Sequence, residues 1–252
     1  MTYCLGILLQ DGLIMAADSR SNAGVDQVTK VNKVALVKRP GERVICILSA
    51  GNLATSQAVV TELTQASGSG DPALDLLAAP SLFGVARLVG DRLRVVTDRH
   101  KKHVPAYVDP TASFLVGGQL KGEPPRLFQI YSAGNFIEAS DRACFMQIGE
   151  TKYGKPILDR ALAWTSSLDE AAKLALLSFD ATLRSNLSVG MPIDLLRYEG
   201  DRFTADELSH IEEDEPYWVD LRRAYGDGLT SLVERLPPPP RPGDGPLAVA
   251  ER

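Results

Sequence analysis

The order in which short apolar runs and longer helical patterns follow one another constrains the fold of this chain most. Apolar runs of strand length come first, then a helical region, more strands, further helices and a closing strand. The expected strands cover residues 2–9, 13–17, 33–37, 43–48, 113–117, 126–131, 135–138, 144–148 and 192–198. Because runs of strands alternate with pairs of helices, we expect an α+β fold in which helical layers cover two antiparallel sheets.

Apolar residues at helical spacing mark the helical regions. The expected helices cover residues 53–64, 72–100, 153–165, 168–185 and 205–235. Asn52 is placed to cap the first of them, and Pro80 is expected to interrupt the second. Residues 21–29 are polar, so we expect mostly loop there. Strands and helices do not alternate singly and no Gly-x-Gly-x-x-Gly motif occurs, which argues against a dinucleotide-binding sheet.

The composition argues against several classes of function. The chain of 252 residues carries a net charge of −5, so nucleic acid is not expected as the principal partner. The cysteines and histidines form no Cys-x-x-Cys or His-x-x-x-His pair, so we expect neither a metal nor a cofactor. Cys4, Cys46 and Cys144 each lie in an apolar run, which favours buried, reduced thiols.

The same apolar runs bear on localisation. No run reaches the roughly 18 residues that a membrane helix requires. The start of the chain shows no basic segment followed by a long hydrophobic stretch, as a signal peptide would. We therefore expect a cytoplasmic protein with no membrane partner.

Thr2 is the candidate nucleophile. It follows Met1 directly, and aminopeptidases remove an initiator methionine readily when the next residue is small. Removal would leave a hydroxyl and a free α-amine on one residue, which are a nucleophile and its base. The turn at residues 10–12 joins two apolar runs, so a hairpin would bring Asp18 back beside Thr2. Many proteins begin with Met-Thr, so the role of Thr2 depends on the motifs that follow.

Several separated motifs resemble a known family. Those similar to the catalytic half of proteasome β-type subunits are Thr2, Gly6, Asp11-Gly12, Ala16-Ala17-Asp18-Ser19-Arg20, Gly24, Lys33-Val34 and Ser49-Ala50-Gly51. Those that most resemble Anbu, the bacterial proteasome-related peptidase family, are the opening Met1–Cys4, Asn22–Asp26, Arg184–Gly190, Pro192–Leu196 and Ile211–Tyr217. The resemblance covers nearly the whole chain.

This resemblance implies an N-terminal nucleophile hydrolase with a four-layer αββα sandwich. It implies a threonine peptidase that assembles into a large homo-oligomer and cleaves peptide or protein substrates. We expect the hydrolase domain at residues 1–200, a helical extension at 201–236 and a proline-rich, mobile tail at 237–252. The alternatives are a non-protease amidase or acylase of the same fold, and a catalytically silent scaffold subunit. The chain shows no ATP site, and whether it needs an ATPase partner stays open.

Four residues are expected to carry the chemistry, namely Thr2, Asp18, Lys33 and Gly51. Lys33 would face Thr2 as a cation that stabilises the developing alkoxide, and Asp18 would orient Lys33. The backbone N–H of Gly51 would meet the oxyanion, although a glycine here also suits a simple turn. Lys30 competes with Lys33 for the role of the cation, but Lys33 fits better because it heads a strand.

Ser19 and Arg20 are the supporting candidates next to Asp18. Arg20 is expected to brace Asp18 or Lys33. The alternative is a plain loop with a surface ion pair, worth about 0–1 kcal/mol. By resemblance, the substrate pocket is modest and mostly uncharged, and its candidate lining residues are Ser21, Val31, Ala35, Ser49 and Leu53.

The chain departs from typical proteasome subunits at two places. Glu150 stands where a serine is usual, after Ile148-Gly149. Where an aspartate usually supports the N-terminal amine, the local side chains are Ser185, Asn186 and Ser188. Neutral side chains can hydrogen-bond the amine, but they do not raise its pKa as a carboxylate would. We expect Glu150 either to supply that carboxylate or to shape a substrate pocket.

Overall fold

The computed structural model describes residues 2–23, 27–105, 107–205 and 208–239. Within these residues the chain forms five α-helices and twelve β-strands. The strands make two five-stranded sheets and one two-stranded sheet, and all paired strands are antiparallel. The chain is therefore a mixed α/β protein with antiparallel sheets, as the sequence predicts.

The first sheet contains the N-terminal hairpin. Its strands, in spatial order, are β10 (Phe145–Gly149), β1 (Tyr3–Leu9), β2 (Gly12–Asp18), β11 (Ile193–Glu199) and β12 (Leu208–Ile211). Every residue of β1 and β2 is buried, because both strands lie inside the sheet and both of its faces are covered. Cys4 pairs with Ala17, so the hairpin returns Asp18 to the start of β1.

The second sheet is a meander. Its strands, in spatial order, are β5 (Val34–Arg39), β6 (Arg43–Gly51), β7 (Ala112–Leu120), β8 (Arg126–Ile130) and β9 (Phe136–Glu138). Side chains of this sheet such as Cys46 and Leu48 pack against Cys4 and Met15 of the first sheet, in one buried cluster. The two sheets therefore face each other across an apolar interior.

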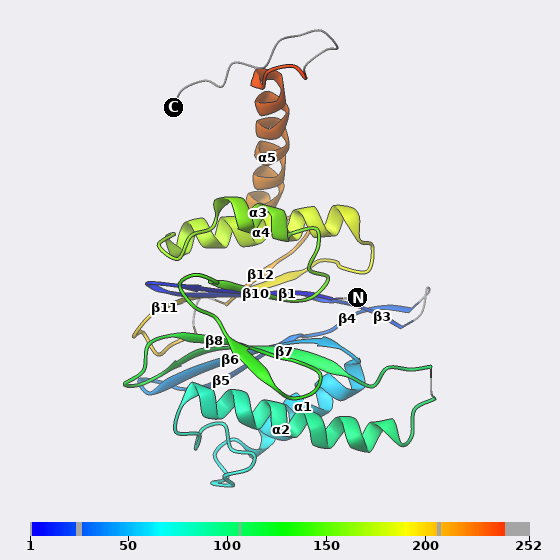
Figure 1. Ribbon diagram of the computed structural model, residues 1–252, viewed down its shortest axis with the longest axis vertical. Helices are drawn as coiled ribbons and strands as arrows, with labels where there is room; N and C mark the ends of the chain where they lie inside the picture. Colours follow the sequence, from blue (N-terminus) through cyan, green and yellow to red (C-terminus); the bar gives the residue numbers. More distant parts are fainter. Residues whose placement is uncertain (1, 24–26, 106, 206–207, 240–252) are drawn as a thin grey trace.

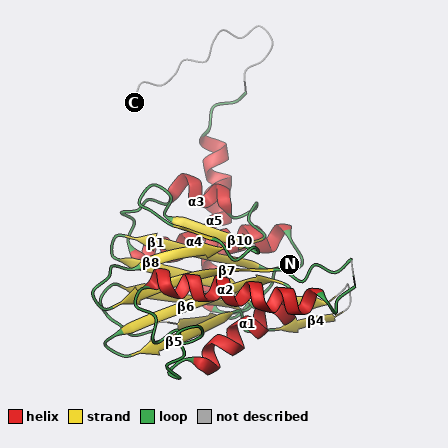
Figure 2. Cartoon of the chain, turned by 60° about the horizontal axis from the view of Figure 1, so that its bottom comes forward, coloured by secondary structure: helices red, strands yellow, loops and turns green. Residues whose placement is uncertain are grey.

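Helices cover the outer faces of both sheets. They are α1 (Leu53–Ala66) and α2 (Leu82–Lys101) on the second sheet, and α3 (Lys155–Ala161) and α4 (Leu168–Ser185) on the first. Figure 1 shows the two pairs on opposite sides of the molecule, and Figure 2 shows α2 lying over the second sheet. Asn52 accepts a hydrogen bond from the Thr55 N–H (3.2 Å), which confirms the predicted cap of α1.

Three predicted segments differ from the structure. Residues 21–29, expected as mostly loop, contribute to the small sheet of β3 (Arg20–Ala23) and β4 (Gln27–Lys30). The helix predicted over 72–100 begins only at Leu82, because the segment before it turns around Asp75, whose carboxylate accepts four backbone N–H groups. Within 205–235 the chain first forms β12 against β11, so the first sheet continues past residue 200.

The last helix, α5 (Pro216–Arg235), extends away from the rest of the molecule. Of its side chains only Trp218 is fully buried, in the cluster beneath α4. The expected proline-rich tail falls mostly at residues 240–252, which lie outside the described part of the chain. Among the described helices, none is both long and apolar enough to cross a membrane.

Candidate active site

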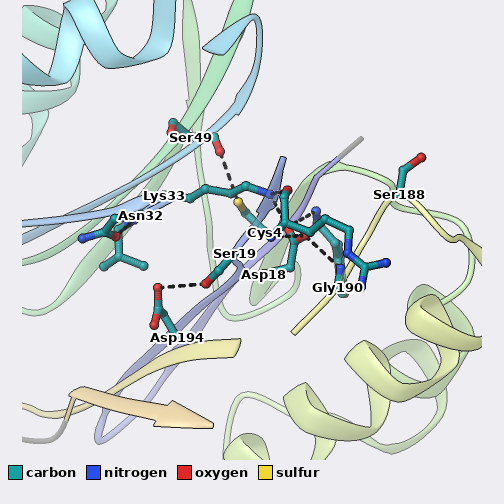
Figure 3. Close-up of polar contacts among 12 residues, drawn as sticks. Cys4, Asp18, Ser19, Asn32, Lys33, Ser49, Ser188, Gly190 and Asp194 are labelled. Carbon is teal, nitrogen blue, oxygen red and sulfur yellow. Dashed lines mark hydrogen bonds and ion pairs between the residues drawn. The ribbon is translucent and has the colours of Figure 1, made fainter. Parts of the chain in front are cut away.

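A buried ion pair joins the end of β2 to the start of β5. Lys33 Nζ lies 2.6 Å from Asp18 Oδ1, and the two side chains are only 4% and 0% exposed. Lys33 Nζ also donates to the backbone carbonyl of Arg20 at 2.6 Å. The Asn32 side chain accepts from the Val34 N–H (2.8 Å), and this local turn directs Lys33 inward just before β5 begins. Figure 3 shows the Lys33 side chain reaching across to Asp18.

The Asp18 carboxylate also holds three backbone N–H groups. Its Oδ1 accepts from Tyr3 (3.0 Å), and its Oδ2 accepts from Gly190 (3.1 Å) and Arg20 (3.3 Å). Because Tyr3 follows Thr2 directly, Asp18 links the start of β1 to the ammonium of Lys33. Burial raises the pKa of Asp18, while the ammonium of Lys33 and the N–H groups of Tyr3 and Gly190 act in the opposite direction.

Thr2 lies between β1 and the end of β10. Its backbone carbonyl accepts the Glu150 N–H at 2.7 Å, and the residue is partly exposed. Gly149 stands opposite Tyr3, and a side chain on Gly149 would meet the Thr2 carbonyl oxygen at 2.0 Å. The strand pairing therefore holds Thr2 at the open end of the first sheet, next to the Asp18–Lys33 pair.

Gly51 is the last residue of β6, and its N–H is directed toward the side of the sheet on which Lys33 lies. The Asn52 N–H donates to the carbonyl of Thr111, just before β7, and the Ser49 N–H donates to the carbonyl of Lys33, just before β5. Because N–H groups alternate along an antiparallel strand, the Gly51 N–H points to the β5 side, beyond the last ladder bond. Gly51 has φ +106°, and a side chain there would lie 2.7 Å from the Thr111 carbonyl oxygen, so the position requires glycine.

The structure separates the two candidate lysines. Lys30 ends β4, is exposed, and pairs with Glu212 at 3.3 Å. Lys33 instead contacts Asp18 inside the molecule. Of the two, only Lys33 is brought to Asp18.

Glu150 and Asn186 meet close to Thr2. Glu150 is buried, and its carboxylate accepts from the Asn186 side chain (2.9 Å) and from the Lys152 N–H (3.2 Å). The Asn186 side chain also accepts the Ser188 N–H at 2.9 Å. The Ser188 hydroxyl points away from Asp18 in Figure 3. Ser185 is exposed at the end of α4, whereas Glu150 contacts the Thr2 backbone and Asn186 contacts Glu150.

Arg20 contacts Asp18 and Lys33 through its backbone, not through its guanidinium. Its side chain donates to the Leu187 carbonyl at 2.8 Å and lies against Gly190, where a Cβ would be 2.1 Å from Arg20 Nε. Arg20 thus holds Asp18 and Lys33 through its backbone, while its side chain leaves β3 toward the 187–190 loop. Arg20 instead fixes that loop, which supplies one of the N–H groups that bind Asp18.

Ser19 belongs to a polar network on the other side of Asp18. The Ser19 hydroxyl donates to Asp194 Oδ2 at 3.5 Å, and Asp194 Oδ1 contacts His210 Nδ1. Asp194 is buried in β11, whereas the His210 side chain is 64% exposed. No residue pattern in the sequence marks Asp194, Tyr3 or Gly190 as a site residue. Tyr3 and Gly190 act through backbone N–H groups, which almost every residue type has, so their residue types do not predict this role.

Three of the five expected pocket residues line one cavity. Ala35, Ser49 and Leu53, together with Lys33, line a cavity of about 370 Å³ between β5, β6 and α1. Its other lining residues are mostly apolar or uncharged. Ser21 and Val31 do not line it. The Val31 N–H donates to the Ser19 carbonyl (2.8 Å), which ties the end of the β3–β4 hairpin back to β2.

The thiol nearest this site is a poor nucleophile. Cys4 is buried, its sulfur contacts the Ser49 carbonyl at 3.5 Å, and burial raises the pKa of the thiol. Cys46 and Cys144 are likewise buried and free. In the described part of the chain, no three His, Cys, Asp or Glu side chains are grouped to hold a metal ion.

Comparison with known proteins gives a clear result among solved structures. No family model and no curated protein matches the chain. Anbu (ancestral beta-subunit) from Yersinia bercovieri is 44% identical, with a TM-score of 0.89 over 95% of this chain and 100% of that one. An Anbu (Gly-1) mutant from Hyphomicrobium sp. strain MC1 is 46% identical, with a TM-score of 0.89 over 96% and 100%.

A third similar structure is the helical assembly of the Anbu complex from Pseudomonas aeruginosa. Its chain is 45% identical, with a TM-score of 0.90 over 94% of this chain and 98% of that one. These likenesses extend over nearly the full length of both chains and confirm the resemblance seen in the motifs. The chain therefore belongs to the Anbu family of proteasome-related subunits.

Proposed function

We propose that this chain is a threonine-type N-terminal nucleophile hydrolase that cleaves peptide or related amide bonds. The observation that carries the proposal is the double contact of Asp18 Oδ1, with Lys33 Nζ at 2.6 Å and with the Tyr3 N–H at 3.0 Å. It sets a buried cation beside the residue that follows Thr2. Membership of a proteasome-related family supports the same reading.

Removal of Met1 would make Thr2 both nucleophile and base. The α-amine has a reference pKa of about 7.7–8.0, so its neutral form can take the hydroxyl proton near neutral pH. The Thr2 Oγ then attacks the substrate carbonyl carbon while the cation of Lys33 stabilises the developing negative charge. Asp18 keeps the Lys33 ammonium in place through the buried ion pair.

The Gly51 N–H is the donor proposed for the tetrahedral oxyanion. It points past the start of β5, and a glycine at this position lets the substrate approach closely. Collapse of the intermediate breaks the C–N bond, and the α-ammonium of Thr2 returns its proton to the leaving amine. Water then hydrolyses the Thr2 ester by the reverse sequence of proton transfers. Glu150, held by Asn186, is proposed to support the amine.

The proposed substrate side chain enters the cavity lined by Ala35, Ser49 and Leu53. A site with these neighbours favours a small or medium, uncharged side chain. For the fold, we propose that the two facing sheets and their helices form the αββα sandwich of N-terminal nucleophile hydrolases. The arrangement in Figure 1 and the burial of both sheet faces support it.

Intact mass spectrometry with a threonine-directed β-lactone or epoxyketone tests the proposal. We expect a protein that has lost Met1 and gains one adduct, located at Thr2 by peptide mapping. Thr2→Ala should lose the adduct, and Thr2→Ser should keep it because the serine hydroxyl is still a nucleophile. A full-length mass without an adduct would contradict the hydrolase and favour a scaffold subunit. An adduct without peptide cleavage in a substrate library would identify an amidase.

We further propose that the chain assembles with copies of itself. The Pseudomonas aeruginosa relative forms a helical assembly. In this chain, the outer half of α5 exposes Leu229, Leu232 and Val233, and Leu236 directly after the helix is also exposed. A helix that carries such a surface is typical of a protein contact.

A further inference from the structure

β10 is an edge strand that ends at the proposed active site. It is the first strand of the five-stranded sheet, with β1 on one side and no strand on the other among the described residues. Its last residue, Gly149, lies against the Thr2 carbonyl. An edge strand presents backbone N–H and C=O groups to which a second extended chain can bind.

The register of β10 shows which of its groups face outward. The Glu150 N–H donates to the Thr2 carbonyl and the Leu8 N–H donates to the Cys144 carbonyl, both at 2.7 Å. The backbone N–H and C=O groups of the even-numbered residues of this segment therefore point to β1. In an antiparallel ladder the odd-numbered residues then point away from β1. Among the described residues no strand pairs with β10 on that side, so the outward N–H and C=O groups of Gln147 and Gly149 have no partner strand.

A cavity of about 590 Å³ lies along these groups. It is lined by Gln147 and Gly149 of β10, by Gly51, by residues of β7 such as Ser113, and by residues of the turn after β8 such as Ser132. None of its lining residues belongs to the cavity that Lys33 and Leu53 line. Two separate cavities therefore lie next to the proposed reaction centre. Lys33 lines one of them, and Gly51 lines the other, along β10.

We propose that the part of a polypeptide substrate that follows the scissile bond binds in this cavity as an extended strand paired with β10. This inference rests on the hydrolase proposed above. The scissile bond lies at Thr2 and Gly51, so the leaving segment starts at Gly149 and runs toward Gln147. That direction is opposite to the direction of β10, and the pairing is antiparallel.

The chemistry of the cavity fits a polypeptide backbone. Its walls carry hydroxyl, amide and backbone groups, and among the described residues that line it Asp109 is the one charged residue. Two outward residues of β10 can each donate and accept a bond, which is the pattern of β-strand addition. The preferred leaving segments are therefore extended and carry neutral or basic side chains. A simple amide with a small leaving group would leave the cavity unused.

Kinetics with substrates of two lengths test the inference. One substrate ends in a fluorogenic amide directly after the cleaved residue, and the other continues for four alanine and serine residues. The extension should raise kcat/KM about tenfold or more, since it adds at least two backbone hydrogen bonds to the bound substrate. N-methylation of a single backbone amide in the extension should remove the gain in kcat/KM when that amide faces β10. At the residues between, whose amides face away from β10, N-methylation should leave the gain in place.

A variant that fills the cavity has a matched control. Ser132→Trp places a bulky side chain at an exposed position in the cavity wall, and Ser140→Trp makes the same change at an exposed position outside it. Ser132→Trp should abolish the gain from the extension and leave turnover of the short substrate unchanged. Ser140→Trp should change neither. Equal rates for the short and long substrates, with normal labelling of Thr2, would overturn the inference and leave the hydrolase intact.

Amide hydrogen exchange on the Thr2→Ala variant tests the pairing without activity. Saturation with the tetrapeptide amide Ala-Ser-Ala-Ser should slow exchange at Gln147 and Gly149. Met146 and Ile148 already point to β1, so their exchange should not change. Unchanged exchange at Gln147 and Gly149 would overturn the inference, whether or not Thr2 is labelled in the native protein.

Discussion

Asp18 shows how much one buried residue organises at this site. Its two oxygens accept four donors, from Lys33, Tyr3, Arg20 and Gly190, which lie on four separate segments of the chain. A buried carboxylate is stable only when its oxygens are paired in this way. The same contacts that satisfy Asp18 therefore also fix where the Lys33 ammonium lies relative to the start of β1.

Replacement of Lys33 should affect both stability and reactivity. Lys33→Ala leaves Asp18 buried without its cation, so we expect the free energy of unfolding to fall by about 3–5 kcal/mol. Lys30→Ala removes only an exposed pair with Glu212, and the expected loss is about 0–1 kcal/mol. Chemical denaturation measures both values. The rate of adduct formation at Thr2 should fall about 100-fold or more only for Lys33→Ala, and equal rates would contradict its role.

Asp18 should titrate above the ordinary carboxyl pKa of about 3.9, because burial raises its pKa. Carbon-13 NMR of the labelled carboxyl measures this value. In Lys33→Ala the pKa should rise further, because the ammonium that opposes the effect of burial is gone. Lys30→Ala should leave the titration unchanged, and an Asp18 pKa at or below the ordinary value would contradict the prediction.

The sign of this shift also sets how Asp18 affects stability. The folded pKa lies above the unfolded one, so the contribution of Asp18 to stability is present below the unfolded pKa and is lost as pH rises through the folded pKa. Acidification should therefore protonate Asp18 at a higher pH in the folded protein than in the unfolded chain, so the titration of this residue favours the folded state at low pH.

At the scale of elements, strand ends decide the geometry of the site. β2 ends at Asp18, β6 ends at Gly51 and β10 ends at Gly149, while Lys33 precedes β5. These ends meet because the two sheets face each other. A strand end can turn a backbone N–H or a side chain toward the opening, whereas the strand interiors remain paired and rigid.

Gly51→Ala should harm both the strand end and the reaction. Its Cβ would meet the Thr111 oxygen at 2.7 Å, and its φ of +106° disfavours any side chain. Gly41 also has a positive φ, of +72°, but has open space around it, so Gly41→Ala is the matched control. The control should cost about 1 kcal/mol of stability and leave adduct formation unchanged. Gly51→Ala should cost more and slow adduct formation, and equal behaviour of the two variants would contradict the role of Gly51.

At the scale of the whole molecule, the buried surface is divided among three apolar clusters. One lies between the sheets, and the other two lie beneath the helix pairs on either side. The side chains of α5 join this interior only near its first turns, where Trp218 is buried and Leu221 packs beside it. The outer half of α5 therefore contributes little to the fold of one copy, although it carries several exposed apolar side chains.

A charge on the apolar face of α5 should weaken assembly without unfolding the subunit. Leu232→Glu introduces a carboxylate among Leu229, Val233 and Leu236, where burial in a contact would be costly. Ser231→Glu makes the same charge change on the opposite side of α5 and is the control. Sedimentation velocity should show smaller particles only for Leu232→Glu, with unchanged circular dichroism. Unchanged particle size for Leu232→Glu would show that this face is not the contact.

Local sequence patterns were sufficient for part of this structure. The apolar runs on either side of residues 10–12 predict the β1–β2 hairpin, and Asn52 predicts the start of α1, because both depend on neighbouring residues. The polar composition of residues 21–29 predicted mostly loop, and this prediction is wrong. The β3–β4 pair is held by backbone contacts rather than by an apolar pattern. The same limit applies to Arg20, whose side-chain direction depends on a loop more than 160 residues away along the chain.

The sequence by itself determined the antiparallel α/β class, most of the strands and helices, the family and the candidates Thr2, Asp18, Lys33 and Gly51, because periodicity and motif spacing are properties of the linear chain. Only the tertiary structure decided that Lys33 rather than Lys30 meets Asp18, and that Glu150 meets Asn186. It also left β10 at an edge beside its cavity. Those features depend on contacts between distant segments, which form only when the two sheets pack face to face.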